Sequence, residues 1–317
     1  MHLPTFLTPQ SVDVAVEIAH RRVSVAQLGK SGGTAVVSAF ASEPLADGVV
    51  TPALTGSNIA QPAIVIASLK KAFERAGLKP PRRIALVVPD SIARLALLPF
   101  EEIPARPADL DQLVRWQLRK AAPFSIDEAH VSYAVASRDG ATTTLATVLA
   151  RREVIAEYEA VANALGMHAG LVDLASLNVA NTVLASGTAP TGDWLLVHLT
   201  QESTTLAIFR GQTLVSYRNR ALADAEPLST LVHQTAMYHE DRLGGSRFAR
   251  VLLSGAGGDP IVAERARREI AERLGVTADV VDARTAVTLR DKITVGPDVL
   301  DALAAPVGIL LRDRKAA

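Results

Sequence analysis

Apolar and polar residues alternate along the first forty residues of the chain. Residues 12–19, 23–28 and 34–40 place apolar side chains at every second position, and short polar stretches at 20–22 and 30–33 separate them. A period of two is typical of β-strands. We therefore predict a three-stranded meander, followed by a helix over 61–76 that ends at Gly77 and by a short apolar strand over 84–88.

The same order of elements recurs in the second half of the chain. Strands are predicted over 194–199, 204–209 and 213–218, a helix over 227–243 and a strand over 250–253. The first hairpin of each half aligns without a gap, each residue of the first matching one 181 positions later. The matched residues are Val16, Val23, Val25 and Leu28 in the first half and Val197, Thr204, Leu206 and Phe209 in the second. Matching order and matching spacing together predict an internal duplication.

Further elements are predicted between and after the two copies. A strand-like stretch covers 91–99, helices cover 107–120, 154–165 and 171–184, and 129–137 with 142–150 resembles a hairpin. The polar stretch 186–193 reads as a linker. After the second copy we expect a helix over 261–274, a strand over 278–281, a helix over 300–311 and a tail over 312–317. Trp116 and Phe124 are predicted in a core, and a peptide groove is their alternative.

Composition and charge narrow the class of protein. The 317 residues are 49% apolar and carry 33 basic and 33 acidic side chains, so the net charge is zero and no nucleic-acid binding is expected. The chain has no cysteine, which excludes disulfides, cysteine-type zinc sites and thiol nucleophiles. The first residues do not resemble a signal peptide, and no run of 18 apolar residues occurs, so we expect a soluble protein.

Two duplicated lobes that each open with a hairpin resemble the actin-like (ribonuclease H-like) superfamily. The residues that carry this likeness are 17–20, 198–201 and the glycine-rich 253–258. Residues 97–100, 113–117, 122–128, Tyr133 and 149–154 are similar to the inserted subdomain of the PilM family of type IV pilus assembly proteins. The resemblance covers at least 12–311. It implies an α/β, two-lobed fold, with a first lobe over 1–190 that contains an inserted α/β subdomain at about 83–150, and a second lobe over 191–317.

The resemblance also implies a function. A protein of this family would be cytoplasmic, peripheral to the inner membrane only through partners, and would dock the cytoplasmic tail of a PilN-like membrane protein and meet other pilus assembly components. It could form a homo-oligomer. Two alternatives stay open: an active, ATP-binding actin-like ATPase, and a scaffold similar to the GspL protein of type II secretion.

The nucleotide-binding turns depart from the family pattern, which is Asp-x-Gly in both hairpins. Here the matching pairs are Glu17 with Ala19, and His198 with Thr200. The resemblance gives a degenerate candidate nucleotide site: Glu17, Ala19, His20, His198, Thr200, Ser203, Thr204, Gly255, Gly257, Gly258 and Gly308. Since phosphates need unobstructed backbone N–H groups and Mg²⁺ needs oxygen ligands, we predict weak or lost nucleotide binding, no catalytic residue and no cofactor, with ATP and Mg²⁺ as the alternative.

The remaining candidates are interpreted as structural. Glu17 and His198 are read as strand-end polar residues, and Arg21 and Arg22 as a solvated turn, with anion contacts as their alternative. Glu202 would repel a triphosphate. His233 and His239 are six residues apart, share no helix face and predict no metal site, and Ser254 lacks the motif of a hydrolase nucleophile.

Overall fold

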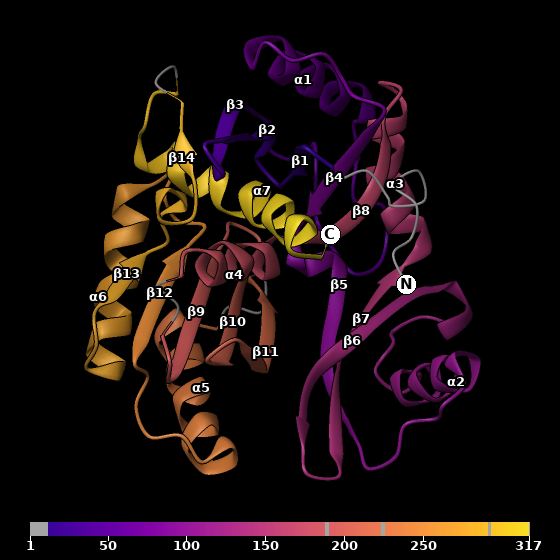
Figure 1. Ribbon diagram of the computed structural model, residues 1–317, viewed down its shortest axis with the longest axis vertical. Helices are drawn as coiled ribbons and strands as arrows, with labels where there is room; N and C mark the ends of the chain where they lie inside the picture. Colours follow the sequence, from indigo (N-terminus) through magenta and orange to yellow (C-terminus); the bar gives the residue numbers. More distant parts are fainter. Residues whose placement is uncertain (1–11, 188–189, 223–225, 291–292, 317) are drawn as a thin grey trace.

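The computed structural model describes residues 12–187, 190–222, 226–290 and 293–316 of the chain. Its described strands form sheets of six, five and three strands. Figure 1 shows the six-stranded and five-stranded sheets on either side of helices α4 and α7, with the three-stranded sheet at the lower right. This arrangement is an actin-like, two-lobed α/β fold.

The first sheet has the order β14-β3-β2-β1-β4-β8. Its strands are β1 (Val14–Ile18), β2 (Arg22–Ser31), β3 (Thr34–Pro44), β4 (Arg83–Val88), β8 (His168–Leu174) and β14 (Thr288–Leu289). Helices α1 (Pro62–Arg75) and α3 (Arg152–Asn163) cover one face, where Val16 and Ile18 pack against Leu69 and Tyr158. The alternate residue Ala15 points to the opposite face, as the period of two requires.

The second sheet repeats this plan with the order β11-β10-β9-β12-β13. Its strands are β9 (Asp193–Leu199), β10 (Ser203–Arg210), β11 (Thr213–Ala221), β12 (Arg250–Ser254) and β13 (Ala278–Val280). Helices α5 (Leu228–Leu243) and α6 (Pro260–Leu274) cover the outer face. The inner face carries Trp194, stacked on Phe209 with ring centroids 4.3 Å apart.

The strand register confirms the duplication that the spacing predicts. Val16 pairs with Val25 in the first sheet, and the residues 181 positions later, Val197 and Leu206, pair in the second. The β-bulge between Gln27 and Leu28 recurs between Ile208 and Phe209, again 181 positions later. The two hairpins are therefore equivalent residue by residue.

Helices α4 (Ala175–Ala185) and α7 (Pro297–Ala316) pack against the inner faces of both large sheets. Two predictions were wrong here. The helix expected over 171–184 begins only at Ala175, because residues 168–174 pair with β4 in parallel, and a short apolar run fits a buried strand as well as a helix. Helix α7 begins at Pro297 and continues through most of the expected tail, and β14 was not predicted.

A small subdomain follows the short 3-10 helix η1 (Asp90–Ile92). It contains β5 (Ala93–Phe100), helix α2 (Pro107–Leu118), η2 (Ile126–Glu128), β6 (Ala129–Asp139) and β7 (Thr142–Arg151). Phe124 packs against its core, but Trp116 is 65% exposed, so the prediction of a core position was wrong for that residue. Val114 and Leu118 face the sheet, and residues two apart on a helix do not share a face.

The expected linker 186–193 falls partly outside the described residues, at 188–189, and Asp193 already belongs to β9. The expectation about the first residues of the chain also falls outside them. Among the described helices, none is both long and apolar enough to cross a membrane.

Candidate functional site

The first turns of the two large sheets meet at a cleft of about 800 Å³. It is lined by the β1–β2 turn, the β9–β10 turn, the turn after β12 and the start of α7. The turns occupy equivalent positions: Ala19 N–H donates to the Arg22 carbonyl at 2.9 Å, and Thr200 N–H donates to the Ser203 carbonyl at 2.9 Å. The predicted sites of the two halves are thus brought face to face.

The first turn is closed by an ion pair between Glu17 and Arg22. The Arg22 Nε donates to Glu17 Oε2 at 3.1 Å, and Nη2 lies 3.4 Å from Oε1. Burial lowers the pKa of Arg22, but the charges of Glu17 and Asp301 outweigh it and raise that pKa overall. The prediction of a solvated turn was therefore wrong for Arg22, and Glu17 has an internal partner for its carboxylate.

The neighbouring residues of this turn also have partners. His20 Nδ1 lies 2.8 Å from the Val50 carbonyl. Arg21 pairs with Asp47, and its Nε donates to Gln201 Oε1 across the cleft at 2.8 Å. Gln201 occupies the position in the second turn that His20 occupies in the first. The hydrogen bond from Arg21 to Gln201 therefore joins the two turns directly.

The second turn is held by hydrogen bonds within itself. Thr200 Oγ1 donates to the Ser203 carbonyl at 3.0 Å and accepts from Ser203 N–H at 3.1 Å. Glu202 is half-buried beside them, and burial raises the pKa of its carboxyl group. Ser203 lines the cleft, whereas Thr204 points to a different cavity on the other side of the sheet.

His198 stands at the carboxyl end of β9, buried beside the end of β12. Its Nδ1 lies 2.8 Å from Ser254 Oγ. The two residues are register partners of parallel strands, so the contact follows from the sheet itself. The His198 imidazole therefore has an internal partner, and it has no carboxylate oxygen with which to bind Mg²⁺.

The glycine-rich turn after β12 packs tightly against its surroundings. Gly255 has a φ of 86°, and a Cβ there would lie 2.4 Å from the Leu199 carbonyl oxygen. A Cβ on Gly257 would lie 2.5 Å from the Cβ of Asp301. Gly258 is open and lines the cleft together with Gly255. Gly255 and Gly257 therefore let the turn approach β9 and α7.

Gly308 does not line the cleft. It lies in α7 against α4, where a Cβ would come within 1.8 Å of the Asn178 carbonyl oxygen. The structure therefore places this candidate in helix packing.

Two acidic residues of the site were missed by the sequence reasoning. Asp90 is buried, accepts from Ser176 N–H at 3.0 Å and from Thr205 Oγ1 at 2.7 Å, and so joins η1 to both α4 and β10. Asp301 of α7 accepts from Gly255 N–H at 2.5 Å. An acidic residue two positions after the apolar strand 84–88 was a usable signal for Asp90, since ligand clefts lie at the carboxyl ends of parallel strands. Asp301 had no such signal within its helix.

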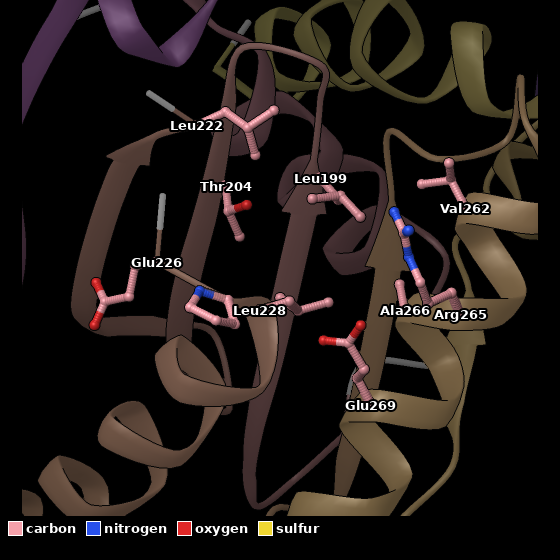
Figure 2. Close-up of a pocket in the computed structure, with 10 residues that line it drawn as sticks. Leu199, Thr204, Leu222, Glu226, Leu228, Val262, Arg265, Ala266 and Glu269 are labelled. Atoms are coloured by element: carbon pink, nitrogen blue, oxygen red, sulfur yellow. The ribbon is translucent and has the colours of Figure 1, made fainter. Parts of the chain in front are cut away.

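A second cavity of about 370 Å³ adjoins the cleft on the outer side of the second sheet. Figure 2 shows Arg265 and Glu269 reaching it from α6 and Leu228 from the start of α5. Glu269 Oε2 accepts from Ser229 N–H at 3.2 Å and so caps α5 from a neighbouring helix. Leu199, Leu222, Val262 and Arg265 line both cavities.

The residues of the cleft fit Mg²⁺ and a triphosphate poorly. Both oxygens of Glu17 face Arg22, and the N–H groups of Ala19, Thr200 and Ser203 already have acceptors. Phosphate cradles depend on free N–H groups, and Mg²⁺ depends on free oxygens. Within the described residues, no group of three or more His, Cys, Asp and Glu side chains could hold a metal ion.

Comparisons with known proteins agree with this architecture. A sequence model of the family described as "Type IV pilus assembly protein PilM" matches residues 15–243. The comparison with curated proteins gave no match. One similar solved structure is described as "PilM-PilN type IV pilus biogenesis complex"; it is 17% identical, the match covers 96% of this chain and 99% of that chain, and the TM-score is 0.79.

A second similar structure is a protein of Bacteroides thetaiotaomicron described as having an actin-like ATPase fold and unknown function. It is 8% identical, the match covers 88% of this chain and 94% of that chain, and the TM-score is 0.50. At these identities the two likenesses show the fold.

Proposed function

This chain belongs to the PilM family of type IV pilus assembly proteins, and from that premise we propose that it is an adaptor that docks the cytoplasmic tail of a PilN-like inner-membrane protein. We further propose that its nucleotide binding is weak or lost. The protein would then work in the cytoplasm, at the inner membrane through its partner. Contacts with other assembly components and a homo-oligomeric state stay predictions.

Docking is supported by how much of the chain the likenesses include. The family match spans the first hairpin, the inserted subdomain and the second hairpin. The likeness to a protein solved together with PilN extends over 96% of this chain. A chain that keeps all these parts, while its cleft has changed, is expected to have kept a binding role rather than a turnover role.

The weak nucleotide site is supported above all by Arg22, whose guanidinium faces the carboxylate of Glu17 in the first turn. Glu17 is the residue that the resemblance assigns to the cation. Thr200 adds a branched side chain to the second turn, folded onto its own backbone. Glu202 adds a carboxyl group on the same side. Arg22 thus competes with a cation for Glu17, Thr200 opposes a triphosphate by volume, and Glu202 opposes it by charge.

One observation favours a second candidate, nucleotide binding without turnover. The cleft volume of about 800 Å³ lies within the range of small-molecule sites. Ala19 and Gly258 are small residues, so the lining of the cleft leaves room for a ligand at these two positions. Only a binding measurement separates this candidate from the first.

Isothermal titration calorimetry on the full chain tests both proposals. One arm uses a synthetic peptide with the sequence of the cytoplasmic tail of a PilN-like protein from the same organism, and a scrambled peptide of the same composition is the control. We expect binding of the tail peptide at about micromolar Kd, which is roughly −8 kcal/mol, and none of the scrambled peptide. Absence of tail binding by the folded chain would overturn the adaptor role.

A second arm titrates Mg–ATP under the same conditions. We expect a dissociation constant no tighter than about 1 mM and no release of phosphate. Micromolar binding without phosphate release would establish the second candidate, and binding with release would establish an active ATPase.

A further inference from the structure

Asp301 lies where α7 meets both lobes. Its side chain is buried, and its Oδ1 accepts from Gly255 N–H of the second lobe at 2.5 Å. Its Oδ2 is buried too, has no hydrogen-bond partner in the described part of the chain, and lies 4.0 Å from Arg22 Nη1. A buried carboxylate oxygen without a hydrogen bond is costly unless a positive charge stands close by.

Arg22 brings that charge from the first lobe. It faces Glu17 through Nε and Nη2 and Asp301 through Nη1, so one guanidinium stands between two carboxylates. The fork of the guanidinium suits this task, because its N–H groups point in fixed, different directions. The resulting chain of contacts runs from Glu17 in β1 through Arg22 in β2 and Asp301 in α7 to Gly255 after β12.

We propose that Glu17, Arg22 and Asp301 form an interlobe clasp, in which the Arg22 guanidinium holds the place between carboxylates that a divalent cation would take, so that the cleft is held without Mg–ATP. This inference rests on the proposed function, and it extends it: docking of the partner tail is not gated by nucleotide. The clasp couples the first turn to the glycine-rich turn of the other lobe.

Two other contacts across the cleft are likewise made by the chain alone. Arg21 Nε donates to Gln201 Oε1 at 2.8 Å, and Thr205 Oγ1 donates to Asp90 Oδ2 at 2.7 Å. Both join the first lobe to the second without a ligand. Both help to hold the lobes together, and the clasp adds a charged link from Arg22 of the first lobe through Asp301 to the Gly255 backbone of the second.

Hydrogen–deuterium exchange on the full chain tests the clasp through a readout in the opposite lobe. Arg22→Ala removes the guanidinium, and Asp301→Asn removes the charge but keeps an oxygen for Gly255 N–H. We expect Arg22→Ala to speed exchange over 253–258, and Asp301→Asn to speed exchange over 17–22, each by about tenfold or more. Loss of the clasp should let the turn of the opposite lobe open locally more often. The double variant should exchange no faster than the faster single variant.

Arg250→Ala is the matched control, since Arg250 pairs with Asp279 on the exposed surface of the second lobe alone. It should leave both segments unchanged. If Arg22→Ala does not fold, Asp301→Asn and Arg22→Lys test the clasp instead. Exchange in Arg22→Lys should still be faster than in the parent chain, because lysine lacks the fork of the guanidinium. Changes confined to the lobe that carries each substitution would overturn the clasp.

Two further measurements separate the clasp from the function it rests on. Mg–ATP should leave exchange of the unmodified chain unchanged at both turns, and protection there would overturn the clasp. The tail-peptide titration is then repeated with and without Mg–ATP. Coupled exchange without tail binding would keep the clasp and refute the adaptor role, and tail binding without coupled exchange would do the reverse.

Discussion

Asp193 shows how a single side chain ties three elements of the second lobe together. It begins β9, accepts two hydrogen bonds of 2.9 Å from Arg210 of β10, and lies 2.7 Å from His239 Nε2 of α5. The hydrogen bond from Arg210 is the main cause that lowers the pKa of Asp193 from 3.8 to about 2, against the opposing effect of burial, and His239 adds to it. His239, buried against Phe248, thus has a structural partner.

Asp193→Asn is expected to lower the free energy of unfolding by about 2 kcal/mol at pH 7, within the range of about 1.5–3 kcal/mol that is usual for hydrogen bonds to a charged group. A carboxyl group whose pKa is lowered by folding stabilises the protein above its unfolded pKa. That contribution is lost as the pH falls from about 4 to about 2. Urea denaturation from pH 7 down to pH 2.5 measures it, and the gap between variant and parent should shrink over that range.

Asp279→Asn is the control for this experiment, since Asp279 pairs with Arg250 at the exposed surface. Its effect should stay below about 0.5 kcal/mol at every pH. A gap for Asp193→Asn that does not change with pH would contradict the role given to its charge.

At the scale of elements, the contact between α4 and α7 depends on close backbone approach. Thr182 Oγ1 of α4 donates to the Ala304 carbonyl of α7 at 2.6 Å. One turn further, Gly308 rests on the Asn178 carbonyl. Around this contact, buried Leu303 and Val307 fill the space between the sheets. The helices therefore pack as one layer shared by both lobes.

Gly308→Val is expected to lower the free energy of unfolding by about 3 kcal/mol, because the added atoms must push the two helices apart in a filled core. Gly258→Ala is the matched control, with no atom within 4 Å of the added Cβ, and should change stability by less than about 0.5 kcal/mol. Chemical denaturation of both variants measures the difference. Equal stability of the two would contradict a packing role for Gly308.

At the scale of the whole molecule, β14 and α7, near the end of the chain, pack against the sheet that its first residues form. We propose that the lobes divide near residue 190, with the inserted subdomain within the first. One observation bears on how independent they are: β14 pairs with β3, and α7 packs against the inner face of the first sheet. A fragment that ends at residue 190 would lack both.

The fragment 1–190 is therefore expected not to unfold cooperatively by itself, since the face that carries Leu28 and Val37 would lose its cover. Co-expressed fragments 1–190 and 191–317 should copurify and regain a sharp thermal transition, because α7 can still bind both sheets. Near-UV circular dichroism and calorimetry measure this. A fragment 1–190 as stable as the parent chain would contradict the shared layer.

Much of the fold could be predicted because its strands carry their own pattern. Alternation predicted β1 to β3 and β9 to β11, and the spacing of 181 residues predicted their equivalence down to the register. Prediction failed where a neighbour decides: residues 171–174 are a strand because β4 lies beside them, and Trp116 is exposed because the subdomain sheet lies on the other side of α2. β14 is too short to show a period.

The sequence by itself determined the duplication, the positions of the two turns and the residues that depart from the family pattern there, because each of these is a local property of the order of residues. Only the tertiary structure decided what those residues do. Arg22 faces Glu17 and Asp301, and Gly308 packs a helix, because residues up to 279 positions apart in the chain meet in space. Charge pairing and close packing act over a few ångströms, a distance that the linear sequence does not contain.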